Sequence, residues 1–333
     1  MDNGDFVHGT GLSLQPERLF SILERMLFSA MNMGNHELYN DELLTLMKDK
    51  GFFDHWGGRY LTSNTVWTET QLPIGHRFAY LNTQHGKPRK LLVFGFLYDF
   101  KGACVSATVQ KVEEVVKQQW FFDVLKVNRK HGKSFNSTTN STSRLAKDFV
   151  DYEYYDGILV LAHMGYDHPL IRVIHSAIRS ITDNEDIPIQ FIAGDSHVRG
   201  YGTLDSASTV VEPGRFLDTV GFVSFPWRPA SYGLPEHYQR ANDTFSKDET
   251  APHDFHHVFL DANKDVLRET LAGNKTGLET GRGRALSHFI QGTRLSLGQT
   301  HIESPDPLSV ASGESTPLYQ HNSYGFYYEA TPE

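Results

Sequence analysis

The chain has 333 residues, of which 39% are apolar and 21% are charged, so it can bury a substantial core and has the composition of an ordinary globular protein. A net charge of -9 and a pI of about 6.0 argue against a nucleic acid or an anionic membrane as partner, because these are bound through clustered Lys and Arg. Cys104 is the only cysteine, which excludes an intrachain disulfide and a cysteine-based zinc site.

The first part of the chain has the pattern of a strand, a helix and a second strand. Residues 2–13 look like a strand end that runs into a glycine-rich loop. An amphipathic helix is predicted over residues 16–30, where apolar side chains recur at i, i+3 and i+4, and a short apolar strand follows at residues 30–33. Asp5 and Asn35 then lie in loops after strands, at the edge of an α/β sheet where ligands bind.

The run Gly34-Asn35-His36-Glu37 is typical of a metal site, although glycine–asparagine pairs are also common in turns. An asparagine amide offers a neutral oxygen ligand that does not cancel the charge of a cation. The adjacent imidazole can then face a reacting group instead of the metal. Taken alone, the run leaves two interpretations open: a turn, or a ligand, Asn35, beside a catalytic group, His36.

The middle of the chain alternates between regular elements and polar segments. The predicted elements are a helix over 41–50 closed by Gly51, strands over 78–83 and 90–97 that form a hairpin, a helical pattern over 109–125, a polar surface insertion over 126–147 and a helix over 171–181. Four Asn-x-Ser/Thr sequons are present, at Asn136, Asn140, Asn242 and Asn274. Such triplets are compatible with passage through a secretory pathway and also arise by chance.

Neither a targeting segment nor a membrane span is expected from the sequence. Residues 1–4 have no basic region and no apolar core, and no run of about 18 apolar residues follows them. We therefore predict no signal peptide in this chain.

Two apolar strands end in polar side chains. Residues 157–163 form a continuous apolar run that ends at His163, and the run over residues 187–193 is followed by Asp195 and His197. A continuous apolar run implies burial on both faces, as in a parallel sheet. With Asp5 and Asn35, four strand ends each present a ligand type, and their common position favours one shared site over chance.

Other residues have weaker claims to a role at this site. Arg199 and Arg215 could bind a phosphate through paired N–H donors, but surface ion pairs are equally compatible with the sequence. Solvated or supporting roles are favoured for the remaining candidate histidines, which are His168, His175, His253, His256 and His257. A packing strand, rather than a platform that stacks a nucleobase, is the favoured interpretation of the cluster Tyr324, Phe326, Tyr327 and Tyr328.

The order of these motifs resembles that of the calcineurin-like metallophosphoesterases. The resemblance rests on Gly4-Asp5, Gly34-Asn35-His36-Glu37, the strand-end His163 and the Gly194-x-x-His197 pattern. More narrowly, the segments 5–13, 35–39, 92–100 and 212–221 are similar to the fungal 5'-nucleotidase-like branch, whose members are also described as UDP-sugar hydrolases. The resemblance covers most of residues 1–225 and is thinner beyond them, where it rests on residues 279–297.

This resemblance implies an α/β fold of four layers, an α-β-β-α sandwich with mixed sheets, and a two-metal site at the strand ends. In the family one Asp bridges two divalent cations that lie about 3.5–4 Å apart. By the resemblance, Asp5 is that bridge, Asn35 and His163 hold the second metal, and His197 binds the first. His36 would stabilise the charge on the phosphoryl oxygens or protonate the leaving group. Mixed oxygen and imidazole ligands suit Zn, Mn or Fe.

Two positions depart from the family pattern. Asp195 stands where the family's Gly-His-x-His motif has an imidazole that binds the second metal, and a carboxylate there can still ligate through oxygen. The family also has an Asp-x-His motif on an earlier strand, which supplies two ligands of the first metal, and no residue precedes Met1 in this sequence. We therefore expect an N-terminally truncated gene model that lacks the first strand and a signal peptide.

The predicted organisation is a metallophosphoesterase domain over residues 1–225 and a partial or divergent 5'-nucleotidase-type α+β region over residues 226–333. Within the second region the sequence predicts a strand at 257–261 and a helix near 283–297. The resemblance and the sequons together imply a secreted or vacuolar location.

Two functions remain open at this point. The first is a hydrolase of a nucleotide or nucleotide sugar, in which a metal-bound hydroxide attacks phosphorus, His36 assists, and Asn35, His36 and Arg199 contact the substrate. The second is a non-catalytic glycoprotein that retains the fold without the ligands of the first metal.

Overall fold

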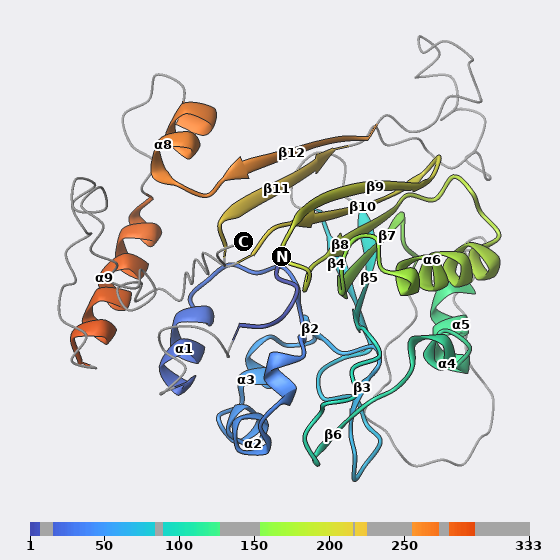
Figure 1. Ribbon diagram of the computed structural model, residues 1–333, viewed down its shortest axis with the longest axis horizontal. Helices are drawn as coiled ribbons and strands as arrows, with labels where there is room; N and C mark the ends of the chain where they lie inside the picture. Colours follow the sequence, from blue (N-terminus) through green and yellow to red (C-terminus); the bar gives the residue numbers. More distant parts are fainter. Residues whose placement is uncertain are drawn as a thin grey trace, which may run out of the picture.

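The computed structural model describes residues 1–6, 16–83, 89–126, 154–215, 217–224, 255–272 and 280–296. At its centre is a six-stranded sheet in the order β4-β5-β7-β8-β10-β9 (Figure 1). The strands are β4 (Phe78–Asn82), β5 (Lys90–Leu97), β7 (Gly157–His163), β8 (Ile189–Ala193), β10 (Ser208–Pro213) and β9 (Arg199–Asp205). The inner strands are parallel to one another, and the edge strands β4 and β9 are antiparallel to their neighbours.

The parallel strands are buried because both faces of the sheet are covered. Every residue of β7 is buried, which confirms the strand predicted from its continuous apolar run. The register pairs Leu97 with His163 and Ala162 with Ala193, so β5, β7 and β8 end at one edge of the sheet. The antiparallel pairing of β4 with β5 confirms the predicted hairpin, whose turn at residues 84–88 lies outside the described residues.

A second, smaller sheet packs against the first. It consists of β1 (Met31–Asn32) and β2 (Tyr60–Leu61), which are parallel, and Asp2 extends it through a bridge to Met31. Buried apolar side chains fill the space between the two sheets; they are Ala30, Leu61, Val93, Leu159 and Leu161.

The Asn32 side chain joins the two sheets. Its Nδ2 donates hydrogen bonds to the backbone oxygens of Phe96 (2.9 Å) and Leu161 (3.4 Å). Gly95 permits this close approach, because a Cβ at that position would lie 2.5 Å from the Leu61 Cβ. The short β1 strand, and with it the motif that follows it, is therefore fixed against the central sheet.

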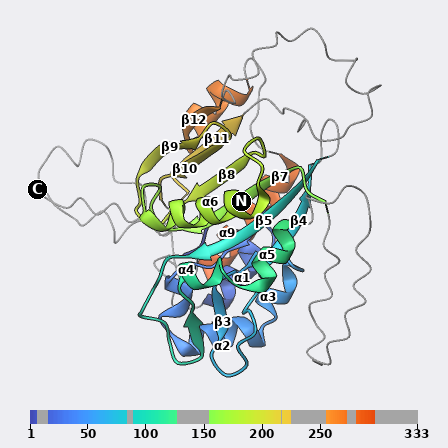
Figure 2. The same cartoon turned by 90° about the vertical axis from the view of Figure 1, so that its right-hand side faces the viewer.

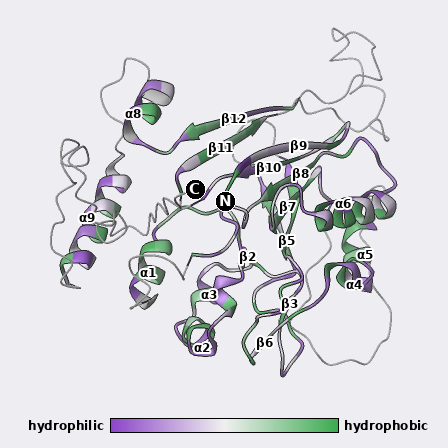
Figure 3. Ribbon diagram, in the orientation of Figure 1, coloured by the Kyte–Doolittle hydropathy of each residue, from purple (hydrophilic) through white to green (hydrophobic). Residues whose placement is uncertain are grey.

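Helices cover the outer face of each sheet. On the side of β1 and β2 these are α1 (Pro16–Leu23), α2 (Asp41–Asp49) and α3 (Phe52–His55), and on the side of the six-stranded sheet they are α4 (Val112–Val115), α5 (Gln119–Lys126) and α6 (Pro169–Thr182). Figures 1 and 2 show the two groups on opposite sides of the strands. This arrangement gives the four α-β-β-α layers that the resemblance implies. Green and purple segments alternate along α6 in Figure 3, as in an amphipathic helix.

Two of the predicted helices differ from the structure. α1 ends at Leu23 rather than near Ala30, because Phe28 and Ala30 are buried where the chain leads into β1. The single helix predicted over residues 109–125 is wrong. Val109 belongs to strand β6 (Ala107–Val109), which pairs with β3 (Thr65–Trp67), and the helical part is divided into α4 and α5. The helices predicted over 41–50 and 171–181 are confirmed as α2 and α6.

The C-terminal elements pack against the elements described above. Strand β11 (Thr219–Ser224) pairs antiparallel with β12 (His256–Asp261), and α8 (Lys264–Leu267), a π-helical turn (Arg268–Ala272) and α9 (Gly281–Ser296) follow. The predicted strand at 257–261 and the predicted helix near 283–297 are confirmed by β12 and α9. Phe289 of α9 lies 3.8 Å below the Arg25 guanidinium, so α9 packs beside α1. The domain boundary at residue 225 stays a prediction.

Several predicted features fall in parts of the chain that are not described, namely the predicted insertion from residue 127 onward, all four sequons, His253 and the aromatic cluster at 324–328. Within the described ranges, no helix combines the length and apolar character needed to cross a bilayer.

Candidate metal centre

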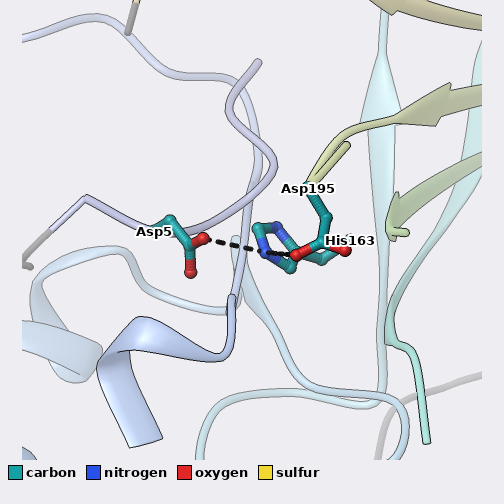
Figure 4. A group of neighbouring side chains, drawn as sticks. All are labelled: Asp5, His163 and Asp195. Carbon is teal, nitrogen blue, oxygen red and sulfur yellow. Dashed lines mark ion pairs between the residues drawn. The ribbon is translucent and has the colours of Figure 1, made fainter. Parts of the chain in front are cut away.

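Asp5, His163 and Asp195 converge at the edge where β5, β7 and β8 end. Each offers one potential ligand atom, and these atoms all lie within 4.8 Å of one another. His163 Nε2 is 3.1 Å from Asp5 Oδ2 and 3.5 Å from Asp195 Oδ1. Figure 4 shows both carboxyl groups directed toward the His163 ring from separate segments. The structure thus brings together three of the residues that the sequence predicts as metal ligands.

Asn35 completes this group of donor atoms. Its Oδ1 lies 3.0 Å from His163 Nε2, and its side chain is buried. Ligands on a metal ion at about 2.0–2.2 Å lie about 3.0–3.5 Å from one another in octahedral or tetrahedral geometry. The three separations from His163 Nε2 have this size. A set of two carboxylates, one imidazole and one amide oxygen suits a divalent cation such as Zn, Mn or Fe. The residues present therefore fit a metal ion.

The contact made by His163 Nδ1 determines that Nε2 is the ring nitrogen that can bind a metal ion. Nδ1 lies 2.6 Å from the backbone oxygen of Asn3, which can only accept a hydrogen bond. In the neutral ring the proton is therefore on Nδ1, and the lone pair of Nε2 faces the carboxylates. Asn3 is held in turn by a 2.8 Å hydrogen bond from its Nδ2 to the backbone oxygen of Ala162.

The electrostatic field at the cluster favours a positive charge. Burial opposes protonation of the His163 imidazole, yet the facing carboxylates of Asp195 and Asp5 raise its pKa well above the usual range. Burial likewise opposes ionisation of Asp5, but His163 and the His36 N–H lower the pKa of this carboxyl below its ordinary value. Within the described residues, the ion pairs of Asp5 and Asp195 run to histidines and not to Arg or Lys. A proton or a metal ion can supply the missing charge.

Glu37 ties the two N-terminal loops together. This carboxylate is buried, and its Oε2 accepts hydrogen bonds from Asp5 N (2.9 Å) and Gly34 N (2.8 Å). The loops interlock closely, because a Cβ at Gly34 would lie 2.5 Å from Asp5 N and a Cβ at Gly4 would lie 2.4 Å from Gly34 N. Glycine is therefore required at both positions, and Glu37 satisfies the backbone donors that the close approach buries.

A second buried glutamate holds the loop that carries Asp195. Glu212 on β10 accepts a 2.8 Å hydrogen bond from the Ser196 hydroxyl and a 2.9 Å bond from Tyr166 N. Burial raises the pKa of Glu212, although these hydrogen bonds act in the opposite direction. Asp195 (φ 73°) and His197 (φ 64°) flank Ser196 in the left-handed region, a conformation that costs about 1–3 kcal/mol and needs such support.

His36 lies beside the cluster on its partly open side. Its backbone N–H donates a 2.9 Å hydrogen bond to Asp5 Oδ1, and its Nε2 is 3.8 Å from Asp5 Oδ2. The His36 side chain is 32% exposed, whereas that of His163 is 3% exposed. His36 can therefore meet a molecule that arrives from solvent, as its predicted role requires.

The remaining predicted residues lie outside this convergent group. His197 is exposed in the same loop as Asp195 and is not among the clustered ligand atoms. Arg199 donates from Nε to Thr219 Oγ1 (2.8 Å) and pairs with Asp261 at the end of β12. These placements leave the predicted roles of His197 and Arg199 as predictions.

The candidate histidines with weaker claims serve other contacts. His168 Nδ1 accepts a hydrogen bond from Leu170 N and caps α6. His175 pairs with Asp205, and His257 stacks on Tyr201 with ring centroids 3.7 Å apart.

Sequence reasoning does not identify Asn3, Glu37 or Glu212 as supporting residues. Glu37 is part of the motif that predicts the site, but its spacing alone does not show that it accepts from both loops. Glu212 leaves one signal, a lone carboxylate in the apolar run Val210-Val211-Glu212-Pro213 of a buried strand. A charge in such a place needs hydrogen-bond donors around it.

Three fungal proteins are similar in sequence to this chain. An uncharacterized protein of Schizosaccharomyces pombe is 25% identical over 95% of this chain and 50% of that protein. One of Saccharomyces cerevisiae is 26% identical over 93% of this chain and 48% of its own length. A protein of Arthroderma benhamiae named "Secreted protein" is 28% identical over 67% of this chain and 31% of its own length. No family model matches. The chain spans about half the length of the first two relatives.

Two solved structures superpose on the chain. The 5'-nucleotidase of Candida albicans gives a TM-score of 0.68 with 25% identity and covers 89% of this chain and 49% of that one. The sulfate thiohydrolase SoxB of Thermus thermophilus gives a TM-score of 0.53 with 13% identity over 91% of this chain and 43% of that one, which shows likeness of fold alone.

Proposed function

We propose that this chain, which has the fold of the metallophosphoesterase superfamily, is a metal-dependent phosphoester hydrolase. The observation that carries the proposal is the convergence of Asp5, Asp195 and His163 Nε2 at one sheet edge. When bound there, a divalent cation would supply Lewis-acid activation of a phosphoryl oxygen and a lowered pKa for water. The side chains of the protein would position the metal-ligating atoms, orient the phosphoester and donate one proton.

His36 is the residue that would donate this proton. Its imidazole is 3.8 Å from the Asp5 carboxylate and partly open to solvent, so it can lie beside a phosphoryl group that a cation held by Asp5 would attract. From there its ring N–H can donate to a phosphoryl oxygen or to the leaving oxygen.

We also propose that the site holds two cations, as the resemblance implies. Asn35, His163 and Asp195 would bind one ion, Asp5 would bridge, and His197 would bind the other. His197 follows Asp195 in the same Glu212-supported loop, and its ring is exposed.

A nucleotide or a nucleotide sugar is the substrate class that we propose. The support is the likeness to the C. albicans 5'-nucleotidase, at 25% identity over 89% of this chain. We place the activity in a secreted or vacuolar compartment, because one relative is named "Secreted protein" and the sequence contains four sequons. Arg199 contributes little to substrate binding in this proposal, since its guanidinium already pairs with Asp261.

The complete gene product that carries this chain tests the proposal. It would be freed of metal with a chelator, reconstituted with Mn²⁺ or Zn²⁺, and assayed on an aryl phosphate and on a nucleoside 5'-monophosphate. We expect turnover to disappear without metal and to return with it. His36→Ala should lower kcat by about 10²–10⁴-fold while bound metal is retained. The matched control is His55→Ala, an exposed histidine on α3 that should leave both unchanged.

The contrary outcomes are distinct. Turnover that survives chelation would contradict a metal-dependent reaction. A protein that binds no metal and hydrolyses neither compound would support the non-catalytic alternative.

A further inference from the structure

We propose that Tyr39 is a positioning residue of the metal site, whose hydroxyl orients the Asn35 amide and whose ring supports the His36 imidazole. This inference rests on the proposed function, because it concerns how one predicted ligand is presented to a cation.

The hydroxyl contact concerns the two ends of the Asn35 amide. Asn35 Oδ1 faces His163 Nε2 at 3.0 Å, and Asn35 Nδ2 donates a 2.7 Å hydrogen bond to the Tyr39 oxygen. A ligand to a cation must present its oxygen, and the NH₂ group at the other end then needs an acceptor. Asn35 is only 4% exposed, so water has little access to its NH₂ group. The Tyr39 hydroxyl is the acceptor that lets the buried amide turn its oxygen toward the ligands.

The spacing in the chain makes this contact possible. Residues His36–Leu38 form a single helical turn, closed by a 3.0 Å hydrogen bond from Leu38 N to Asn35 O. In such a turn, side chains three or four residues apart lie on one face. Tyr39 therefore meets Asn35 at i, i+4 and His36 at i, i+3. The Tyr39 and His36 ring centroids are 4.9 Å apart in an edge-to-face arrangement.

A neighbouring loop keeps Tyr39 in place although its side chain is 47% exposed. The Phe100 ring packs edge-to-face on Tyr39 with centroids 5.4 Å apart. The loop that carries Phe100 is fastened to the same helical turn, because Cys104 N donates a 2.8 Å hydrogen bond to Leu38 O. Gly102 lets the loop cross the Phe100 ring, since a Cβ there would be 2.7 Å from Phe100 Cζ. The Tyr39 ring is thus in contact with both Phe100 and His36.

The test removes the hydroxyl and keeps the ring. The metal-free complete gene product and its Tyr39→Phe variant would be titrated with Mn²⁺ alone, and binding would be followed by calorimetry or by the spin-resonance signal of free Mn²⁺. Loss of a group that orients a ligand costs about 10–100-fold in metal affinity, and we expect a loss in this range. The melting temperature of the metal-free protein should change by no more than about 2 °C. Tyr154→Phe, which removes a hydroxyl from a 61% exposed tyrosine near the start of β7, should bind Mn²⁺ like the wild type.

A double-mutant cycle shows whether Tyr39 acts through Asn35. In an Asn35→Ala background, Tyr39→Phe should lower the Mn²⁺ affinity no further, because the amide that the hydroxyl orients is gone. Equal losses in both backgrounds would overturn the inference, and so would an unchanged affinity in Tyr39→Phe alone.

The titration also separates this inference from the proposed function. If Mn²⁺ binds and Tyr39→Phe weakens it through Asn35, the inference stands even where no phosphoester is hydrolysed. If the wild type hydrolyses phosphoesters and Tyr39→Phe binds Mn²⁺ equally well, only the inference fails. A wild-type protein that binds neither Mn²⁺ nor Zn²⁺ would overturn both.

Discussion

Two aspartate–histidine clusters lie at opposite edges of the six-stranded sheet, and they differ in how their charge is balanced. At the carboxyl edge of the parallel strands, His163 Nε2 is 3.1 Å from Asp5 Oδ2 and 3.5 Å from Asp195 Oδ1. At the other edge, where β9 ends and β10 begins, His175 Nε2 is 2.8 Å from Asp205 Oδ2. The residue types are the same at both places.

In the second cluster, the positive charge of Arg179 balances the negative charge of Asp205. The guanidinium donates to both oxygens of Asp205, from Nε at 2.7 Å and from Nη2 at 3.1 Å. Its Nη2 also donates to the Ser208 hydroxyl at 2.6 Å. By contrast, the described ion pairs of Asp5 and Asp195 have no Arg or Lys partner. A cluster of aspartate and histidine side chains therefore indicates a metal site only where no arginine or lysine beside it balances the negative charge.

The largest effect is expected when the same substitution is made in each cluster. Asp5→Asn should lower the Mn²⁺ affinity of the metal-free protein by more than about 100-fold, since it removes a ligand rather than a group that orients one. Asp205→Asn should leave that affinity unchanged and lower the free energy of unfolding by about 2–3 kcal/mol, because Arg179 is largely buried and would lose its bidentate partner. Calorimetric Mn²⁺ titration and urea unfolding measure the two quantities. Metal loss in Asp205→Asn would remove the distinction between the clusters.

A smaller effect on the free energy of unfolding is expected at acid pH. Burial alone would raise the pKa of Asp205, but His175 and Arg179 hold it well below its usual range. A carboxyl with a lowered folded pKa stabilises the protein above its unfolded value of about 3.9, and this contribution is lost as the pH falls below that value. The difference in unfolding free energy between wild type and Asp205→Asn should therefore be constant from pH 7 to about pH 5 and should shrink below about pH 4.

Urea unfolding at several pH values checks this expectation. Arg179→Met offers a second route, because Asp205 without its guanidinium should contribute less of this pH dependence. A difference between wild type and Asp205→Asn that stays constant down to pH 3 would show that the arginine does not hold the carboxylate in its ionised form.

The sequence predicts the elements that form the metal site better than it predicts the contacts that hold them. The strands before His163 and Asp195 follow from apolar runs, and Gly34-Asn35-His36-Glu37 follows from the order of its residue types. These features are local, so a short stretch of chain specifies them.

The support of the site depends on contacts between distant segments. Glu212 reaches Ser196 from a different strand, and Asn3 reaches His163 across 160 positions of the chain. No periodicity encodes such contacts. A contact between distant segments also explains why α1 ends early. Phe28, which follows α1 and precedes β1 in the chain, is buried near the ring of Trp56, with the ring centroids 6.1 Å apart.

The smallest effect is expected at Arg199, which the sequence leaves open between a phosphate contact and a surface ion pair. Its partners Thr219 and Asp261 belong to β11 and β12, and the two charged side chains are 42% and 51% exposed. Exposed ion pairs contribute about 0–1 kcal/mol, so Arg199→Met should change the free energy of unfolding by no more than this. It should also leave KM for an aryl phosphate unchanged, because the guanidinium serves the β11–β12 pair. A severalfold rise in KM at unchanged stability would instead show that Arg199 leaves Asp261 to bind phosphate, and the positive charge missing from the Asp5 cluster would then come partly from the protein itself.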